Sequence, residues 1–368
     1  EKTILQIAPA LKKLALDVHA NPELGFEERK ACAWQIDILR RHGFEVENPY
    51  NGLKTAYLAK KGAGRPAVCF LAEYDALPGL GHACGHNLIA AMSAGAAIAV
   101  DRMLKEAAMR GTVMLIGTPA EEKGGGKVKL VNEGCFEGID CAVMVHPASS
   151  TRVEDITLAS TRLVLTYAGK PAHAAAAPWH GANALEAVIQ TFNQVNALRC
   201  QLRDLSRING IITKGGTAVN IIPELAEASF GIRAANRKYL DELVEKVGAC
   251  ARNAAASMGV SVDIVRMGQG YDAMMNNPVM EELMAANFRA LGEDVTPYSE
   301  KIGLSSSDMG NVTRVLPGAQ CYVKVKDDIK PHTAEFSEAC VGETAIDIFC
   351  EPTFLSNMRD AYRKQIEA

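Results

Sequence analysis

The sequence lacks a surplus of charge of either sign, a long apolar run and any pair of cysteines with C-x-x-C spacing. Lysine and arginine together number 39, and aspartate and glutamate number 43, which gives a net charge of −4. Surfaces that bind nucleic acid or anionic membranes need a clustered basic excess, so this balance predicts neither partner. The longest nearly apolar run, Leu88–Val100, falls short of the ~20 residues that cross a bilayer and predicts a buried helix.

Several functional motifs are missing as well. Residues 123–127, Lys-Gly-Gly-Gly-Lys, look like a phosphate-binding loop, but Val128 stands where such a loop needs serine or threonine. No G-x-G-x-x-G follows a predicted strand, and no G-x-S-x-G occurs. The leucine-rich start of the chain is broken by Lys12 and Lys13 and has no signal-peptide core. Because the ten cysteines are scattered like reduced, buried thiols, we expect a cytoplasmic protein.

The chain is long enough for more than one domain, with 368 residues of which 48% are hydrophobic. Short apolar strands alternate with helices in its first part and again near its end. Strands are expected at 55–60, 67–72, 112–118, 141–145 and 320–325, and helices up to about residue 19 and at 27–42, 87–105, 127–133 and 278–291. This order predicts an α/β catalytic domain, made by residues 1–158 and 268–368, with helices on both faces of a mainly parallel sheet.

The middle of the chain has a different order. Strands are expected at 161–168, 207–213, 226–234 and 260–266, with helices at 182–202 and 238–258. The sequence β-α-β-β-α-β is that of a ferredoxin-like α+β module. We therefore expect residues 159–267 to form a smaller domain inserted into the first.

Polar side chains follow three of the predicted strands of the first domain. They are Glu73 and Asp75, then Glu121 and Glu122, and finally His146. Ligands of open parallel sheets bind at the carboxyl ends of the strands, so this edge is the expected functional site.

The densest cluster of reactive residues is the segment Gly81–Asn87, which holds His82, Cys84 and His86 together with two glycines that allow a tight turn. Thiolate and imidazole are ligands of zinc and other first-row metals. A helix-capping loop with a buried thiol, or a nucleophilic Cys–His pair, would also explain the residues of this segment.

Three further segments could add ligands, although each has a simpler explanation. The adjacent Glu121 and Glu122 could be surface acids, and His146, which ends a strand, could be satisfied by backbone groups. His332 lies in the short segment Lys330–Thr333 and means little alone. Together with Cys84, however, these residues would suffice for two metal ions.

In this order the motifs resemble the M20 metallopeptidases. They are similar to the amidohydrolase subfamily, which includes hippurate, indole-acetyl-amino-acid and aminobenzoyl-glutamate hydrolases, and most of all to its aminoacylase-1-like-2 (M20 domain-containing protein 2) subgroup. The resemblance covers essentially the full chain and rests on the segments Ala72–Pro78, His82–Asn87, Pro119–Glu122, His146-Pro147 and His332.

The resemblance implies a centre of two divalent metal ions, zinc or manganese, with nickel possible. Cys84 would bridge the ions, His86 and Glu122 would complete one of them, and His146 and His332 would complete the other. Glu121 would be the general base, and Asp75 would orient a metal-bound imidazole. Two positions depart from the indole-acetyl type: Glu73 and Asn87 both stand where aspartate is common.

The inserted domain would supply the remaining groups and, by the same resemblance, act as a dimerisation and lid domain. His173 would reach across a homodimer to the oxyanion, and Asn220 and Arg233 would hold the free carboxylate of the substrate. The segment Gly303–Asp308 resembles a serine-acid segment that lines the pocket, although a polar loop would look the same.

The expected function is therefore a metal-dependent amidohydrolase. It would release an amino acid from N-acyl amino acids, dipeptides or aryl-amide conjugates through a metal-activated water, with Glu121 as base. Two alternatives stay open at this point: a catalytically silent metal-binding or ligand-sensing protein of the same fold, and a thiol hydrolase that uses Cys84 and His86.

Overall fold

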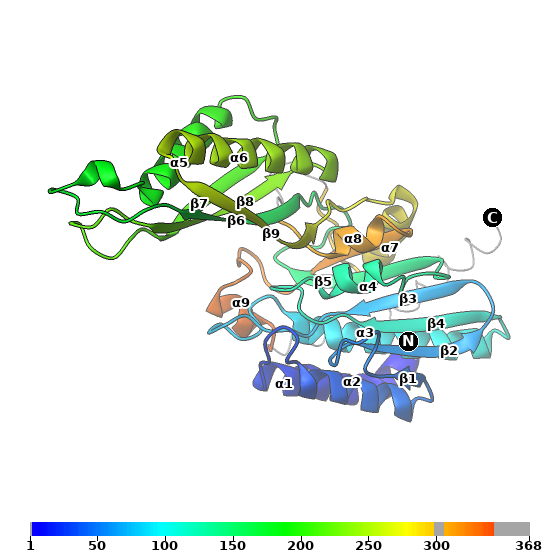
Figure 1. The fold of residues 1–368 in the computed structure, drawn as a ribbon. Coiled ribbons are helices and arrows are strands. Elements are labelled where there is room, and N and C mark those ends of the chain that lie inside the picture. The colour runs from blue at the N-terminus through cyan, green and yellow to red at the C-terminus, as the bar shows by residue number, and fades with distance from the viewer. Residues whose placement is uncertain (1, 298–304, 342–368) are drawn as a thin grey trace. The chain divides into compact units, whose positions relative to one another are not determined.

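The computed structural model describes residues 2–297 and 305–341, which form two compact units (Figure 1). The first unit contains the described residues 2–156, 274–297 and 311–341, and the second contains 157–273 and 305–310. Residues 305–310 were expected in the long catalytic domain. They belong instead to the second unit, because Ser305 and Ser306 hydrogen-bond to the backbone of Leu158.

The first unit is built on a six-stranded sheet of order β1-β2-β4-β3-β5-β10. The strands are β1 (Glu45–Glu47), β2 (Tyr57–Ala63), β3 (Ala67–Ala72), β4 (Gly111–Gly117), β5 (Cys141–Ala148) and β10 (Gly318–Lys324). The last four strands of that order pair in parallel, and β1 and β2 extend the sheet in antiparallel fashion. All six residues of β3 are buried. Because successive side chains of a strand point to opposite faces, both faces of the sheet are covered, which confirms the predicted α/β class.

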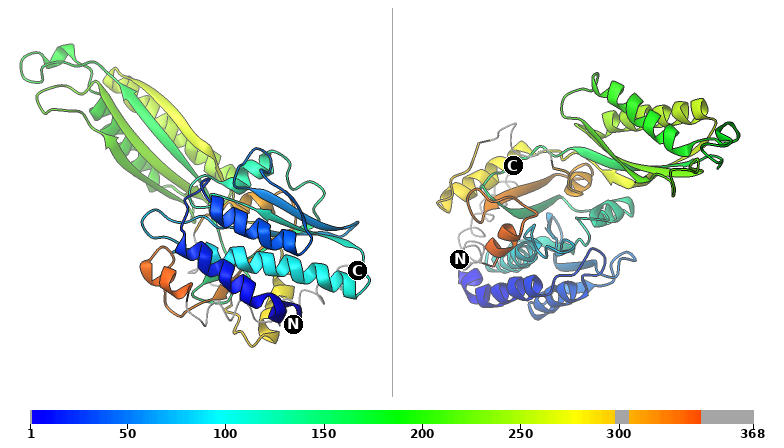
Figure 2. Two further views of the ribbon diagram at one scale, coloured as in Figure 1. Left: turned by 90° about the horizontal axis from the view of Figure 1, so that it is seen from below. Right: turned by 90° about the vertical axis from the view of Figure 1, so that its left-hand side faces the viewer.

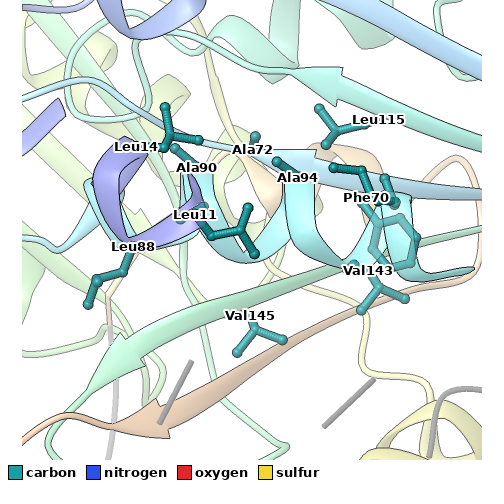
Figure 3. Close-up of a cluster of buried hydrophobic side chains, with 14 of the residues drawn as sticks. Leu11, Leu14, Phe70, Ala72, Leu88, Ala90, Ala94, Leu115, Val143 and Val145 are labelled. Atoms are coloured by element: carbon teal, nitrogen blue, oxygen red, sulfur yellow. The ribbon is translucent and has the colours of Figure 1, made fainter. Parts of the chain in front are cut away.

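Helix α3 (His86–Glu106) forms the centre of the main core. It packs across β3, β4 and β5, and α1 (Lys2–Ala20) and α2 (Arg29–Arg41) lie beside it (Figure 2, left). Leucines of α1 meet small residues of α3 and branched or aromatic residues of the strands (Figure 3). By length and composition α3 could cross a membrane, but 78% of its most apolar 18-residue window is buried. It is the buried helix that the apolar run predicted.

Among the described residues, the other helices besides the two long ones of the second unit are shorter. They are α4 (Gly126–Asn132), α7 (Pro278–Ala290), which packs on β10, α8 (Met309–Thr313) and α9 (Ala334–Ala339). The sequence patterns missed α8, α9 and the three-residue strand β1. These elements are too short to show a periodic pattern of apolar residues.

The second unit has the expected β-α-β-β-α-β order, and its antiparallel sheet runs β7-β8-β6-β9. Its elements are β6 (Ala159–Ala168), the short η1 (Pro178–His180), α5 (Ala184–Arg199), β7 (Arg207–Lys214), β8 (Leu225–Ala234), α6 (Arg237–Met258) and β9 (Ser261–Tyr271). Both long helices pack on one face of the sheet (Figure 2, right). Asn183 and Asn236 cap these helices through their side chains, which fixes where the helices begin.

Candidate metal centre

The candidate site lies at the carboxyl end of the parallel strands of the first unit. β3 is hydrogen-bonded to both β4 and β5 in parallel, so the ends of these strands share one edge of the sheet. Glu73 and Asp75 follow β3, Glu121 and Glu122 follow β4, and His146 lies in β5. The edge predicted from the polar strand ends is therefore the one where these side chains meet.

A tight turn before α3 aims Cys84 and His86 at the same place. Gly85, between them, has φ 78°, and a Cβ there would lie 2.3 Å from the Pro147 Cγ. Only glycine fits this left-handed and crowded position. The His86 Nδ1 lies 3.0 Å from both the Oδ1 and the backbone oxygen of Asp75. This contact leaves Nε2 of His86 free to face the cluster, so Asp75 holds the position expected of an orienting acid.

Cys84, His86 and His146 form one group that could hold a metal ion, with ligand atoms within 4.8 Å of one another. The Cys84 Sγ lies 3.7 Å from the His146 Nε2. The His146 Nδ1 donates to the backbone oxygen of Pro147 at 2.7 Å, which directs the lone pair of Nε2 toward the thiol.

Cys84 belongs also to a second group, with Glu122 and His332. The His332 Nε2 lies 3.5 Å from the Glu122 Oε1. The backbone of His332 donates to the carbonyl of Ala83 at 2.8 Å and has φ 64°, which brings this late residue to the loop of Cys84. Cys84 is thus placed to bridge. The two groups pair His86 with His146 and Glu122 with His332, which differs from the pairs expected from the sequence.

The donor atoms fit divalent ions. Tetrahedral zinc with bonds of about 2.0–2.1 Å to nitrogen or oxygen and about 2.3 Å to sulfur separates its ligand atoms by roughly 3.3–3.6 Å. The separation of 3.5 Å between His332 and Glu122 lies in this range, and that of 3.7 Å between Cys84 and His146 lies just above it. The His86 Nε2 is buried without a hydrogen bond to any described residue. A cation between these groups would satisfy it.

The electrostatics of the cluster favour ligation. Burial lowers the pKa of His146 to about 4, which keeps its imidazole neutral, the form that binds metal. Burial alone would also lower the pKa of His86, but the charges of Cys84 and of the nearby carboxylates raise it well above its usual value. His332 has a raised pKa because of its hydrogen bond to Glu122. The carboxylates beside His86 and His332 therefore place negative charge in the cluster, which would favour a bound cation.

Glu121 lies beside the cluster, where a base would act. One of its carboxylate oxygens lies within 4.8 Å of ligand atoms of His86 and Glu122. Its neighbour Glu122 is held through the backbone, since its N–H donates to the Asp75 Oδ2 at 3.0 Å. Asp75 thereby connects His86, which follows β3, to the backbone of Glu122, which follows β4.

Sequence reasoning missed some residues of this region and overrated another. Glu28 is buried, and its Oε1 accepts from the backbone of Ala120 at 2.8 Å, where φ is 60° just before the two glutamates. Nothing in its local pattern separates Glu28 from a surface acid at a helix start. His82 was expected to point toward the same place as Cys84 and His86. It is buried, but it belongs to none of the possible metal groups among the described residues.

The other predicted residues lie in the second unit. His173 and Asn220 are exposed and lie on neighbouring loop segments, joined where the Ala174 N–H donates to the Asn220 carbonyl at 3.0 Å. Arg233 is exposed on β8 and donates to the Ser306 Oγ at 2.9 Å. This contact connects Arg233 to the serine-acid segment, of which Gly303 lies outside the described residues.

Comparison with known proteins agrees with this geometry. Residues 69–351 match the family described as Peptidase family M20/M25/M40. The chain is 35% identical to an Xaa-Arg dipeptidase of Mus musculus, over 98% of this chain and 91% of the relative. It is 30% identical to a p-aminobenzoyl-glutamate hydrolase chain of Escherichia coli (strain K12), over 82% of this chain and 66% of the relative.

Solved structures share the fold at low sequence identity. A Bacillus subtilis protein described as a dinuclear metal binding peptidase from the M20 family has a TM-score of 0.73 at 20% identity, covering 98% of this chain and 99% of that one. An aminobenzoyl-glutamate utilization protein from Klebsiella pneumoniae has a TM-score of 0.68 at 20% identity, covering 95% and 97%. The expected M20-type hydrolase of amide or peptide bonds is confirmed, and the chain belongs to peptidase family M20/M25/M40.

Proposed function

We propose that the protein is a dinuclear metallo-amidohydrolase that releases an amino acid from an N-acyl amino acid, a dipeptide or an aryl-amide conjugate. The observation that carries the proposal is the convergence of Cys84, His86, Glu122, His146 and His332 from distant parts of the chain into two groups that share one sulfur. Zinc or manganese suits this mixed set of donors, and nickel would also fit. When bound, the ions would supply Lewis-acid activation of water and of the amide carbonyl.

Glu121 is the proposed general base. Its carboxylate lies beside the ligand atoms of His86 and Glu122 but is not needed to complete either three-residue group around Cys84. It would accept a proton from the attacking water and pass it to the departing nitrogen. Asp75 would keep both sides of this arrangement in place, through His86 and through the backbone of Glu122.

His173 is the proposed donor to the oxyanion. Its Nδ1 accepts from the backbone N–H groups of Ala175 and Ala176, at 3.3 and 3.1 Å. In the neutral ring the proton is then on Nε2, which is ready to donate. The ring is exposed, so its Nε2 is accessible to a substrate or to a second copy of the chain.

We propose that the second copy is a homodimer partner. The edge strand β7 exposes Ile211 and Ile212, and the following loop exposes Val219 completely. An unpaired edge with apolar side chains is a surface that a protein usually covers. An open cavity of about 430 Å³, lined by residues 215–219 and 221–223, adjoins these residues.

A free carboxylate on the substrate is the proposed recognition element of the second unit. The Arg233 guanidinium can meet a carboxylate with two hydrogen bonds, and the amide of Asn220 can donate as well. Two of the relatives are an Xaa-Arg dipeptidase and a p-aminobenzoyl-glutamate hydrolase. Both names describe compounds in which an amino acid carries a free carboxylate beside the scissile amide, and we carry that substrate class over to this chain.

The proposed location is the cytoplasm. All nine described cysteines are unpaired, which suits a reducing compartment. A thiolate that bridges metal ions also needs protection from oxidation.

The test combines metal analysis with a product assay. The purified protein is expected to hold two divalent ions per chain and to release free amino acid from members of a panel of dipeptides, hippurate-like and aminobenzoyl-glutamate-like compounds. A chelator should abolish turnover, and zinc or manganese should restore it. The variant His180→Ala, at an exposed histidine of the second unit, is the control. Bound metal without cleavage of any member would support a silent binding protein instead, and turnover that survives chelation would support a thiol hydrolase.

A further inference from the structure

A buried ion pair lies next to the metal centre and is not part of the five-residue ligand set. The Lys127 Nζ lies 2.5 Å from the Glu73 Oε1, and the two side chains are 0% and 1% exposed. Lys127 comes from the start of α4, within the glycine-rich segment that is not a phosphate loop, and Glu73 follows β3. Burying two charges is costly unless the charges serve each other or a third group, so such a pair needs an explanation.

The second oxygen of Glu73 points to that third group. Its Oε2 lies 3.3 Å from the His86 Nε2, the nitrogen that faces the metal centre. Both atoms are buried, and neither has a hydrogen-bond partner among the described residues. Asp75 already occupies the other nitrogen of His86. If His86 binds a metal ion through Nε2, this nitrogen cannot donate a hydrogen bond to Glu73, and the two buried lone-pair atoms would then need a cation between them.

The separation itself supports a shared cation. Two ligand atoms at about 2.0–2.1 Å from a tetrahedral ion are roughly 3.3 Å apart. The Glu73 Oε2 and the His86 Nε2 are separated by 3.3 Å, closer than the 3.9 Å between the same nitrogen and the Glu122 Oε1. The distance between Glu73 and His86 therefore fits two ligands of one ion.

Lys127 explains how the site tolerates another carboxylate. Carboxylate oxygens of Glu73 and Glu121 lie within 4.8 Å of each other, and Glu122 adds a further negative charge close to His86. Like charges at such distances repel strongly in a buried site. The ammonium of Lys127 offsets the charge on Oε1 and leaves Oε2 as a donor toward the centre.

We propose that Glu73 is a further ligand of the ion that His86 holds, and that Lys127 is its internal counter-ion. The inference rests on the proposed metallo-hydrolase function. It assigns to this ion one carboxylate more than the five-residue set, and so a higher coordination number than that of its neighbour.

The experiment measures metal binding directly. The apo wild-type protein and Glu73→Gln are titrated with zinc against a chromophoric chelator, and both are loaded with cobalt(II) for visible absorption spectra. We expect Glu73→Gln to lower the binding affinity for one of the two ions by at least about 10-fold and to leave the affinity for the other unchanged. We also expect stronger cobalt bands in this variant, because fewer ligands give a less symmetric, more intense spectrum.

Two further variants keep the result clear if Glu73→Gln folds poorly because the buried Lys127 has lost the charge of Glu73. The double variant Glu73→Gln/Lys127→Met removes both buried charges and should show the same loss of one ion in a stable protein. Asp101→Asn is the matched control, because Asp101 is a largely buried acid paired with Lys61 at 2.9 Å near the far end of α3. It should bind both ions like the wild type.

The outcomes separate the two proposals. A folded double variant that binds both ions with wild-type affinity and gives the wild-type cobalt spectrum would refute the role of Glu73, while the metal centre would stand. A wild-type protein that binds no ions at all would refute the proposed function together with the inference.

Discussion

The two units present their functional residues in opposite ways. In the first unit Glu73, Asp75 and His86 are almost completely buried and contact one another at 3.0–3.3 Å. In the second unit His173, Asn220 and Arg233 are all exposed, on two loops and a strand face. The first arrangement is complete without a further molecule other than its ions. The second places these side chains at the surface, which suits the proposed contacts with a substrate and another copy of the chain.

The sheets explain this difference. Parallel strands bring several loop starts to one edge, where the first residues after each strand can be enclosed by neighbouring loops and helices. In the antiparallel sheet of the second unit, both long helices cover one face, and its core is made of apolar side chains such as Leu165 and Phe230. The three candidate functional residues of this unit are instead displayed at its surface. Substitutions in the first unit should alter chemistry and metal content, whereas those in the second should alter turnover or affinity alone.

Among variants that test this difference between the two units, Glu121→Gln should have the largest effect on activity. Loss of a general base should lower kcat by about 10²–10⁴-fold. Because Glu121 is not needed to complete either group around Cys84, both ions should remain, as metal analysis can check. Glu122→Gln is the matched variant and should lose metal as well as activity. Loss of metal in Glu121→Gln would make this residue a ligand rather than a base.

His173→Ala should have the next largest effect. Removal of one oxyanion donor typically lowers kcat by about 10²–10³-fold. The variant should keep its metal and its thermal stability, because the ring is exposed. His180→Ala, also at an exposed histidine, should behave like the wild type. Wild-type turnover by His173→Ala would exclude this ring from the reaction.

Arg233→Ala should raise KM more than it lowers kcat. A charged, bidentate hydrogen bond to a carboxylate is worth a few kcal/mol, so KM should rise roughly 10–100-fold. The effect should disappear for a substrate whose carboxylate is replaced by a carboxamide, which serves as the control. Equal losses for both substrates would show that Arg233 acts through its contact with Ser306 and not through the substrate.

The smallest effect is expected at Glu28, which accepts a hydrogen bond from the backbone of Ala120, just before Glu121 and Glu122. Burial raises the pKa of Glu28 from 4.5 to about 7. Between these values the folded protein holds a proton that the unfolded chain has released, so this group makes stability fall as pH rises through that window. Glu28→Gln cannot ionise and keeps an acceptor for the N–H of Ala120.

The measurement is the difference in Tm between Glu28→Gln and the wild type from pH 5 to pH 8. The Tm of the variant should rise relative to that of the wild type by a few degrees as pH increases, given roughly 2–4 °C of Tm per kcal/mol of stability. A Tm difference that does not change with pH would mean that Glu28 is ionised in the folded protein at all these values.

Much of the fold could be predicted because it depends on local pattern. The strand at 67–72 is found at the predicted residues, and the long helix after it begins at His86, one residue before the expected start. The very short β1 escaped, and the segment 305–310, expected with the first unit, clusters with the second. Its attachment depends on hydrogen bonds to Leu158, almost 150 residues earlier, which no local pattern can report.

The candidate site was predicted as a set of residues but not as an arrangement. Cys84, His86 and the acids after the strands are recognisable by type, spacing and order. The pairing of His86 with His146, and of Glu122 with His332, was expected otherwise, because it depends on how four loops approach one another. Lys127 was set aside with a failed phosphate motif. Its role as the partner of Glu73 becomes visible only when α4 is placed beside the end of β3.

By itself, the sequence determined the kinds of chemistry that this protein can perform, because ligands, base and turn glycines are properties of residue type and short spacing. The tertiary structure alone decided which possible metal ligands lie close together and which charges are buried together. Distances of 3–4 Å between residues tens to hundreds of positions apart arise from strand order and helix packing, and these are set by the whole chain at once.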